Sequence, residues 1–240
     1  MNLKVLGSSS SGNCYILDNG REALLIEAGL PIKAINKALR FDFSKVVGCL
    51  VSHRHGDHCK SLKKLDGLVD IYCSEDVAVS KEIRHYSPIE HLKKVSIGSF
   101  DVMPFDVIHD VPCLGFFIRH KDMGKLAFIT DSAYSDYCFK GVNTLMVECN
   151  YTNDGLVRAI NNGTTPSFQR NRLIQTHMEL EETMRVISSN KNEDLRNVIL
   201  LHLSSRNSDE DYMVEQIKLK LGINAIVAKS GLEIELKSLY

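Results

Sequence analysis

The sequence lacks the features of secreted, membrane-spanning and repetitive proteins. Its 240 residues include only 5 prolines and no low-complexity run or internal repeat, which argues against linkers and repeat arrays. No stretch approaches the roughly 18 to 20 apolar residues that a membrane helix needs, and the N-terminus has no cationic start followed by a long apolar segment. We therefore expect a single domain over residues 1–240, located in the cytoplasm and without a membrane partner.

The number and spacing of the cysteines argue against a disulfide framework and against a zinc finger. The seven cysteines are scattered and include no Cys-x-x-Cys pair, so we expect most of them to be small buried side chains. The net charge is close to zero, with 29 Lys and Arg against 30 Asp and Glu. A polyanionic partner would therefore have to be held by a local basic patch. The sequence leaves the oligomeric state open.

Short runs rich in Val, Ile and Leu recur along the chain, and helical patterns lie between many of them. The runs predict strands over residues 3–6, 14–17, 23–27, 46–52, 69–73, 100–108, 114–119, 125–130, 144–148, 197–203, 223–228 and 232–236. The patterns predict helices over residues 31–39, 57–65, 75–85, 154–162, 180–189 and 209–221. Early strands form near-hairpins and later ones alternate with helices, so we expect an α/β (α+β) fold with mixed sheets covered by helices.

A loop of small residues, Gly7 to Asn13 (GSSSSGN), joins the first two predicted strands. Small side chains let backbone N–H groups approach an anion closely. A flexible hairpin connection is the alternative, because neither a Walker lysine nor a following helix supports a phosphate loop. We take Ser9, Ser10 and Asn13 as candidate substrate contacts.

Four potential metal ligands follow the predicted strand 46–52 within six positions. They are His53, His55, Asp57 and His58. Alternate side chains at a strand end point in the same direction, so the first two histidines could bind one cation. The other two residues could bind a second cation nearby. Imidazole and carboxylate are the ligands of zinc and similar ions. A chance cluster of exposed histidines is the alternative, which this spacing after an apolar strand disfavours.

The His-x-His-x-Asp-His pattern resembles that of the metallo-β-lactamase superfamily. This resemblance implies a four-layer αββα sandwich of two mixed β-sheets flanked by helices. Further potential ligands stand at later strand ends in the family's order, namely His109, Asp131 and His202. The resemblance then implies two divalent metal ions, Zn²⁺ or Mn²⁺, with His53, His55 and His109 on one ion, Asp57, His58 and His202 on the other, and Asp131 between them.

Such a metal pair predicts hydrolysis. Two cations about 3.5–4 Å apart clamp the attacked and leaving oxygens of an ester, and a metal-bound water ionises near neutral pH to give the hydroxide nucleophile. Asp57 would also steer this water as a catalytic residue. A non-catalytic binding module that keeps the fold is an alternative, against which seven apparently complete ligands argue.

Two further residues point to a nuclease branch. The placement of Glu148 and His177 resembles that in tRNase Z-type nucleases, where the histidine, held by the glutamate, would protonate the leaving oxygen. An imidazole oriented by a carboxylate is suited to general acid catalysis. Along nearly the whole chain the resemblance is closest to the small YycJ/WalJ-like nucleases. A departure is Glu27, which stands where the family usually has Asp.

Cations near these motifs favour a nucleic-acid substrate. Lys60 follows the central motif, and Arg170 and Arg172 lie in a stretch, residues 155–178, that has no acidic residue. Ordinary solvated surface is the alternative reading of such residues. We expect a phosphodiester hydrolase, a nuclease of the DNA exonuclease type, with DNA favoured over RNA. The alternative is a metal-dependent hydrolase of a small-molecule ester, thioester, lactone or cyclic phosphodiester.

Overall fold

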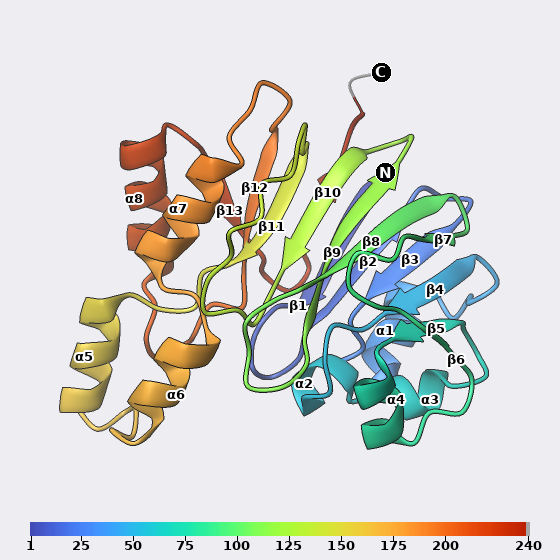
Figure 1. Cartoon of the computed structure of the whole chain (residues 1–240), viewed down its shortest axis with the longest axis horizontal. Helices are drawn as coiled ribbons and strands as arrows, with labels where there is room; N and C mark the ends of the chain where they lie inside the picture. Colours follow the sequence, from blue (N-terminus) through green and yellow to red (C-terminus); the bar gives the residue numbers. More distant parts are fainter. Residues whose placement is uncertain (239–240) are drawn as a thin grey trace.

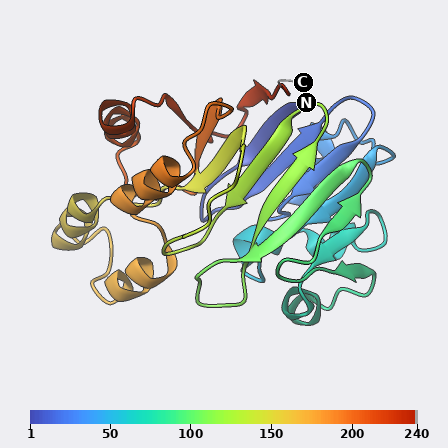
Figure 2. The ribbon, with the colours of Figure 1, turned by 45° about the horizontal axis from the view of Figure 1, so that its top comes forward.

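Two mixed seven-stranded β-sheets pack face to face, and helices cover their outer faces (Figure 1; Figure 2). The computed structural model describes residues 1–238. The first sheet has the order β14-β1-β2-β3-β4-β5-β6 and the second has the order β13-β12-β11-β10-β9-β8-β7. The first sheet contains β1 (Asn2–Gly7), β2 (Cys14–Asp18), β3 (Ala23–Ile26), β4 (Val46–Leu50), β5 (Ile71–Cys73), β6 (Tyr86–Pro88) and β14 (Glu233–Glu235). The second contains β7 (Val95–Ile97), β8 (Phe100–Asp106), β9 (Leu114–His120), β10 (Gly124–Ile129), β11 (Thr144–Glu148), β12 (Asn197–Leu201) and β13 (Ala225–Val227).

The helices fall into two groups along the chain. The first sheet carries α1 (Ile32–Ala38), α2 (Gly56–Cys59), α3 (Leu62–Leu65) and α4 (Glu75–Lys81), and the chain beyond β11 forms α5 (Asn153–Asn161), α6 (Gln169–Thr176), α7 (Leu180–Ser189) and α8 (Glu210–Leu221). Among the residues described, no helix is long and apolar enough to cross a membrane. The expected cytoplasmic location stays a prediction.

Three clusters of buried side chains hold these layers together. The central cluster lies between the sheets and includes Tyr15, Phe116 and Phe128. A second cluster joins the outer face of the second sheet to α7 and α8, and a third joins the outer face of the first sheet to α1, α3 and α4. Burial of both sheet faces explains why the strands of this chain are continuous apolar runs. The predicted sandwich of two mixed sheets flanked by helices is confirmed.

The topology brings several strand ends to one edge of the sandwich. Strands β10, β11 and β12 are parallel neighbours, so their carboxyl ends lie together. Strand β8 runs in the same direction as β10, because each is antiparallel to β9. In the other sheet β4 is parallel to β3 and ends beside α2. This edge, at the lower end of the sandwich in Figure 1, therefore gathers residues from distant parts of the chain.

Apart from small shifts of strand ends, the structure differs from the predicted elements in five places. The predicted helix 57–65 is two short helices, α2 and α3, and the predicted helix 75–85 ends at Lys81 because Glu82 adopts a left-handed conformation. Strands β6 and β7 and helix α6 were not predicted. His177 is extended directly after α6, and α7 spans Leu180–Ser189 as predicted.

Candidate metal centre

The predicted metal ligands meet at the shared strand edge. His53 follows β4, His109 follows β8, Asp131 follows β10 and His202 follows β12. The backbones of Asp131 and His202 have φ angles of 50° and 53°, in the left-handed region. Residues other than glycine pay a conformational cost there, and such strain is typical of functional sites. The strand ends thus turn sharply at the point where they present these side chains.

Three histidines form the first group. Nε2 of His53 lies 3.0 Å from Nδ1 of His55, and Nε2 of His109 lies 3.2 Å from the same atom. The second ring nitrogen of His109 donates a hydrogen bond to the carbonyl oxygen of Thr176 at 3.0 Å, which leaves Nε2 free to bind a metal. One ligand atom from each histidine lies within 4.8 Å of the others, so this group fits a divalent cation.

The second group is centred on the buried imidazole of His58. Its Nε2 lies 3.0 Å from Oδ2 of Asp131 and 3.5 Å from Oδ2 of Asp57, and Nε2 of His202 lies 3.4 Å from the same oxygen of Asp57. Asp131 also forms a group with His53 and His58, which places it between the two sets. All seven predicted ligands are therefore brought together, while their binding of metal stays a prediction.

Buried polar groups support this second set from behind. The carboxylate of Glu27 lies 3.3 Å from Nδ1 of His58 and accepts a hydrogen bond from the backbone N–H of Ser52. Glu27 thus reaches the motif although the resembling family usually has the shorter Asp. Asn13 is fully buried, with Nδ2 3.0 Å from Nε2 of His58 and 3.5 Å from Oδ2 of Asp57. Its Oδ1 is buried and has no hydrogen-bond partner among the described residues.

His177 and Glu148 form a close pair beside Asp131. Nδ1 of His177 lies 2.7 Å from Oε1 of Glu148 and 3.5 Å from Oδ1 of Asp131. The other carboxylate oxygen of Glu148 accepts the backbone N–H groups of Ser132 and Met178, at 2.8 and 3.4 Å. Fixed in this way, Glu148 orients the imidazole and leaves Nε2 of His177 for another partner.

The titrating groups of the centre shift one another strongly. Burial acts to lower the pKa of His58, but the carboxylates of Asp131 and Glu27 raise it well above its ordinary value. Burial acts to raise the pKa of Asp131, but the imidazoles of His202 and His58 hold it well below its ordinary value. The pKa of His53 falls because the ring is buried and lies beside His58. The protonated imidazole of His58 compensates the buried carboxylates, and a divalent metal would take over that role with neutral imidazoles as its ligands, because metal binding displaces ligand protons.

A cavity of about 380 Å³ opens over these groups. Ser10 and Arg172, two of the predicted substrate contacts, line it, and Arg172 pairs with Asp110 at 3.0 Å. Ser9 is half-buried in the loop, where its hydroxyl accepts the N–H of Ser11. The other two basic residues that were predicted to contact substrate are exposed, namely Arg170 on α6 and Lys60 at the end of α2. Substrate contact by all of these residues, and by Asn13, stays a prediction.

Sequence reasoning missed one acidic residue of the centre. Asp110 lies 3.2 Å from Nε2 of His109 and 3.5 Å from Nε2 of His55. Its place directly after His109 was the available signal. The role of Thr176, whose carbonyl accepts from His109, depends on the unpredicted helix α6 and could not be found from the sequence.

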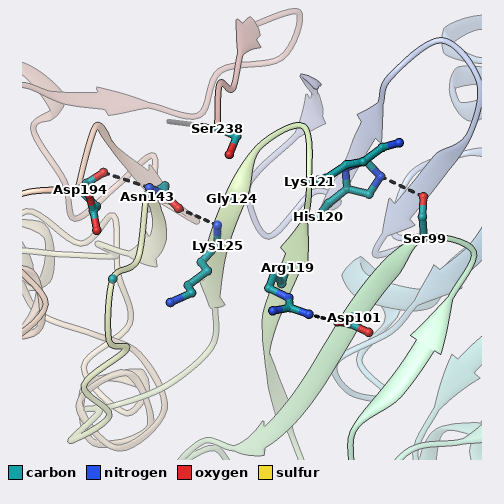
Figure 3. Close-up of a pocket in the computed structure, with 11 residues that line it drawn as sticks. Ser99, Asp101, Arg119, His120, Lys121, Gly124, Lys125, Asn143, Asp194 and Ser238 are labelled. Carbon is teal, nitrogen blue, oxygen red and sulfur yellow. Dashed lines mark hydrogen bonds and ion pairs between the residues drawn. The ribbon is translucent and has the colours of Figure 1, made fainter. Parts of the chain in front are cut away.

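A larger cavity lies elsewhere, at the opposite ends of β9 and β10 (Figure 3). It measures about 620 Å³, and several of the charged side chains that line it already have partners. Arg119 pairs with Asp101 at 2.8 Å, and Nζ of Lys125 donates to a backbone carbonyl at 3.0 Å. The smaller cavity, which the predicted metal ligands line, is therefore the candidate site.

Comparison with known proteins gives one family and consistent relatives. Residues 23–203 match the profile of the β-lactamase superfamily domain. The chain is 27% identical over 234 residues to the exodeoxyribonuclease YycJ of Bacillus anthracis, covering 87% of this chain and 84% of that protein. It is 25% identical over 224 residues to the exodeoxyribonuclease WalJ of Streptococcus pneumoniae, covering 85% and 82%.

Solved structures show the same fold. The metallo-β-lactamase fold protein YhfI from Bacillus subtilis superposes with a TM-score of 0.76 at 19% identity, covering 98% of this chain and 99% of that chain. Zn²⁺-bound PqqB from Methylobacterium extorquens superposes with a TM-score of 0.75 at 14% identity, covering 98% and 100%.

Proposed function

Because this chain belongs to the β-lactamase superfamily and is a metal-dependent hydrolase, we propose that it is a nuclease that hydrolyses phosphodiester bonds of DNA. Two relatives that it matches over more than four fifths of its length are named exodeoxyribonucleases. The observation that carries the proposal is the contact of His177 with Glu148 at the edge of the metal-ligand cavity. Nucleic acid is accordingly the proposed partner.

The proposed chemistry divides between metal and side chains. Two divalent ions, Zn²⁺ or Mn²⁺, held by the seven ligands would supply Lewis-acid activation of the phosphodiester and of water. The half-buried carboxylate of Asp57 lines the cavity and accepts a hydrogen bond from His202, so Asp57 would orient the attacking water. His177, held through Nδ1 by Glu148, presents Nε2 to the leaving oxygen and donates a proton to it.

The direct test is cleavage of end-labelled single-stranded and double-stranded DNA and RNA by metal-loaded protein. Asp131→Ala serves as the control for contaminating nucleases, because Asp131 lies between both ligand groups. DNA cleavage that is lost in this variant supports the proposal, and the product lengths distinguish attack at ends from internal attack. Metal-loaded protein that leaves every nucleic acid intact would overturn it.

The cavity volume favours one second candidate. About 380 Å³ lies in the range of small-molecule sites, roughly 300–1,000 Å³. The same residues would then hydrolyse a small ester, thioester, lactone or cyclic phosphodiester. Turnover of such compounds without cleavage of DNA or RNA would select this function, whereas correct folding with no bound metal would select a non-catalytic binding module.

A further inference from the structure

One face of α6 runs outward from the metal-ligand cavity to an exposed aromatic ring. Thr176 and Arg172 line the cavity, and Phe168 lies one helical turn beyond Arg172, already in the helical conformation. Side chains four residues apart lie on the same side of a helix. Phe168 is 81% exposed, whereas Thr176 is buried beside His109. The face spans about 12 Å from Thr176 to Phe168 at 1.5 Å per residue.

A second cavity of about 400 Å³ adjoins the first along the neighbouring face of α6, which carries Gln169 and Leu173. Residues lining both cavities are Ser10, Gln169, Leu173, His177 and His202. Gln169 directly follows Phe168 but points about 100° away from it around the helix, so the second cavity lies beside the face of Thr176, Arg172 and Phe168. The far wall of the second cavity is polar and includes Ser204, Ser205 and Arg206.

The charge of α6 suits a phosphate backbone. Residues 155–178 contain three arginines and no acidic residue. Arg172 now pairs with Asp110, and the side chains of the two are 66% and 33% exposed. Such an exposed ion pair contributes little stability, so Arg172 exchanges its partner for a phosphate at small cost. Arg170 lies about 200° around the helix from Phe168, on another face.

We propose that this face of α6 is the binding track for a single-stranded end of the nucleic acid. Phe168 stacks on a base, Arg172 contacts a phosphate, and the adjoining phosphodiester reaches the metal ligands. The proposal rests on the nuclease function above. Stacking on a protein ring requires a base free of its own stack, and every base has a suitable face. The reactive groups also lie at the bottom of a small cavity, with Asp131 only 2% exposed, which one strand enters and a duplex does not.

The first test replaces the aromatic ring and compares two substrates. Phe168→Ala is expected to raise KM for a single-stranded DNA oligonucleotide about 5- to 100-fold with kcat little changed, the range produced by loss of one base stack. Hydrolysis of bis(4-nitrophenyl) phosphate, which is too small to reach the ring, should stay at the wild-type rate. Phe41→Ala is the matched control, because Phe41 is 75% exposed in the turn after α1 and should behave as wild type.

The second test compares the two arginines. Arg172→Ala should weaken oligonucleotide binding and reduce the salt dependence of KM, and Arg170→Ala should do so less. Equal oligonucleotide kinetics in Phe168→Ala and Phe41→Ala would overturn the track while leaving the nuclease function intact. An equal rise in the KM of Phe168→Ala for blunt duplex DNA would overturn the assignment to a single strand. Wild-type protein that hydrolyses the nitrophenyl diester but no nucleic acid would instead overturn the nuclease function itself.

Discussion

At the residue scale, the centre depends on short contacts between fully buried side chains. Glu148 is 0% exposed and holds the imidazole of His177, while Glu27 and Asn13, equally buried, hold the opposite side of the site against His58. Partners of this kind fix the tautomer and orientation of metal-binding and proton-donating groups. Single substitutions should therefore separate metal binding from turnover.

Replacement of the proton donor should remove turnover and spare the metals. His177 is outside the seven ligands and borders the cavity, so His177→Ala is expected to keep the wild-type metal content. Loss of a general acid lowers kcat by about 10²–10⁴-fold. Metal analysis and steady-state kinetics on the same sample check both halves. Full activity in the variant would remove His177 from the mechanism.

Substitution of Asn13 tests whether this residue supports the metal ligands or contacts the substrate. The side chain lies behind Asp57 and His58, so Asn13→Ala is expected to weaken metal binding about 10- to 100-fold, as loss of an outer partner does. Titration of metal-depleted protein against a chelator measures this. Ser10→Ala is the comparison, since Ser10 lines the cavity and is exposed. Unchanged metal affinity with a raised KM would favour the substrate contact expected from the sequence.

At the element scale, the loop after β3 is pressed against the start of α2. The N–H of Asn13 donates to the carbonyl oxygen of Asp57 at 2.8 Å, and the N–H of Gly29 donates to the carbonyl oxygen of Asn13 at 2.9 Å. Three segments thus meet through their backbones. A Cβ atom at Gly29 would lie 1.6 Å from the carbonyl oxygen of Asp57, so only glycine fits this junction.

Gly29→Ala is accordingly expected to lower the free energy of unfolding by about 3 kcal/mol, the upper part of the usual range for overpacking. It should also reduce metal content, because the displaced backbone carries Asp57. Urea unfolding and metal analysis measure the two effects. Gly56→Ala, one position before Asp57, is the control, since a Cβ there meets nothing within 4 Å. Equal stability of the two variants would contradict the close-packing argument.

At the scale of the whole molecule, the metal ligands come from both sheets. The motif from His53 to His58 follows β4 of the first sheet, and His109, Asp131 and His202 follow strands of the second. Bound metal would cross-link the two halves of the sandwich. A ligand that binds only the folded state stabilises it by about 2.7 kcal/mol at 100 times its Kd.

Addition of Zn²⁺ or Mn²⁺ to chelator-treated protein is therefore expected to raise Tm by about 5–10 °C at that excess. Thermal unfolding at several metal concentrations measures the shift. Asp131→Ala should lose most of it, because this carboxylate lies between both ligand groups. A Tm that does not move with metal would count against the predicted ligand set.

The sequence predicted those parts of the molecule that have strong local signals. The ligands from His53 to His58 could be recognised because four donors follow one apolar strand. Helix α6 was missed because its sequence, QRNRLIQT, buries only Thr176 and so has almost no apolar periodicity. Strands β6 and β7, with the sequences YSP and VSI, lack the apolar runs from which the other strands were predicted. Asp110 stands next to His109 in the sequence, but its contact with His55 depends on tertiary packing.

The pairing of β1 with β14 has a consequence for how the protein is made. Asn2 and Lys4 lie opposite Glu235 and Glu233. One edge of β1 therefore pairs with a strand that lies more than 220 positions later in the chain. During synthesis the hydrogen-bonding edge of β1 remains open on the ribosome, and an unpaired edge invites association with other chains. Completion of this sheet is therefore a late event, and nascent chains stopped before residue 233 should be the ones that most need a chaperone.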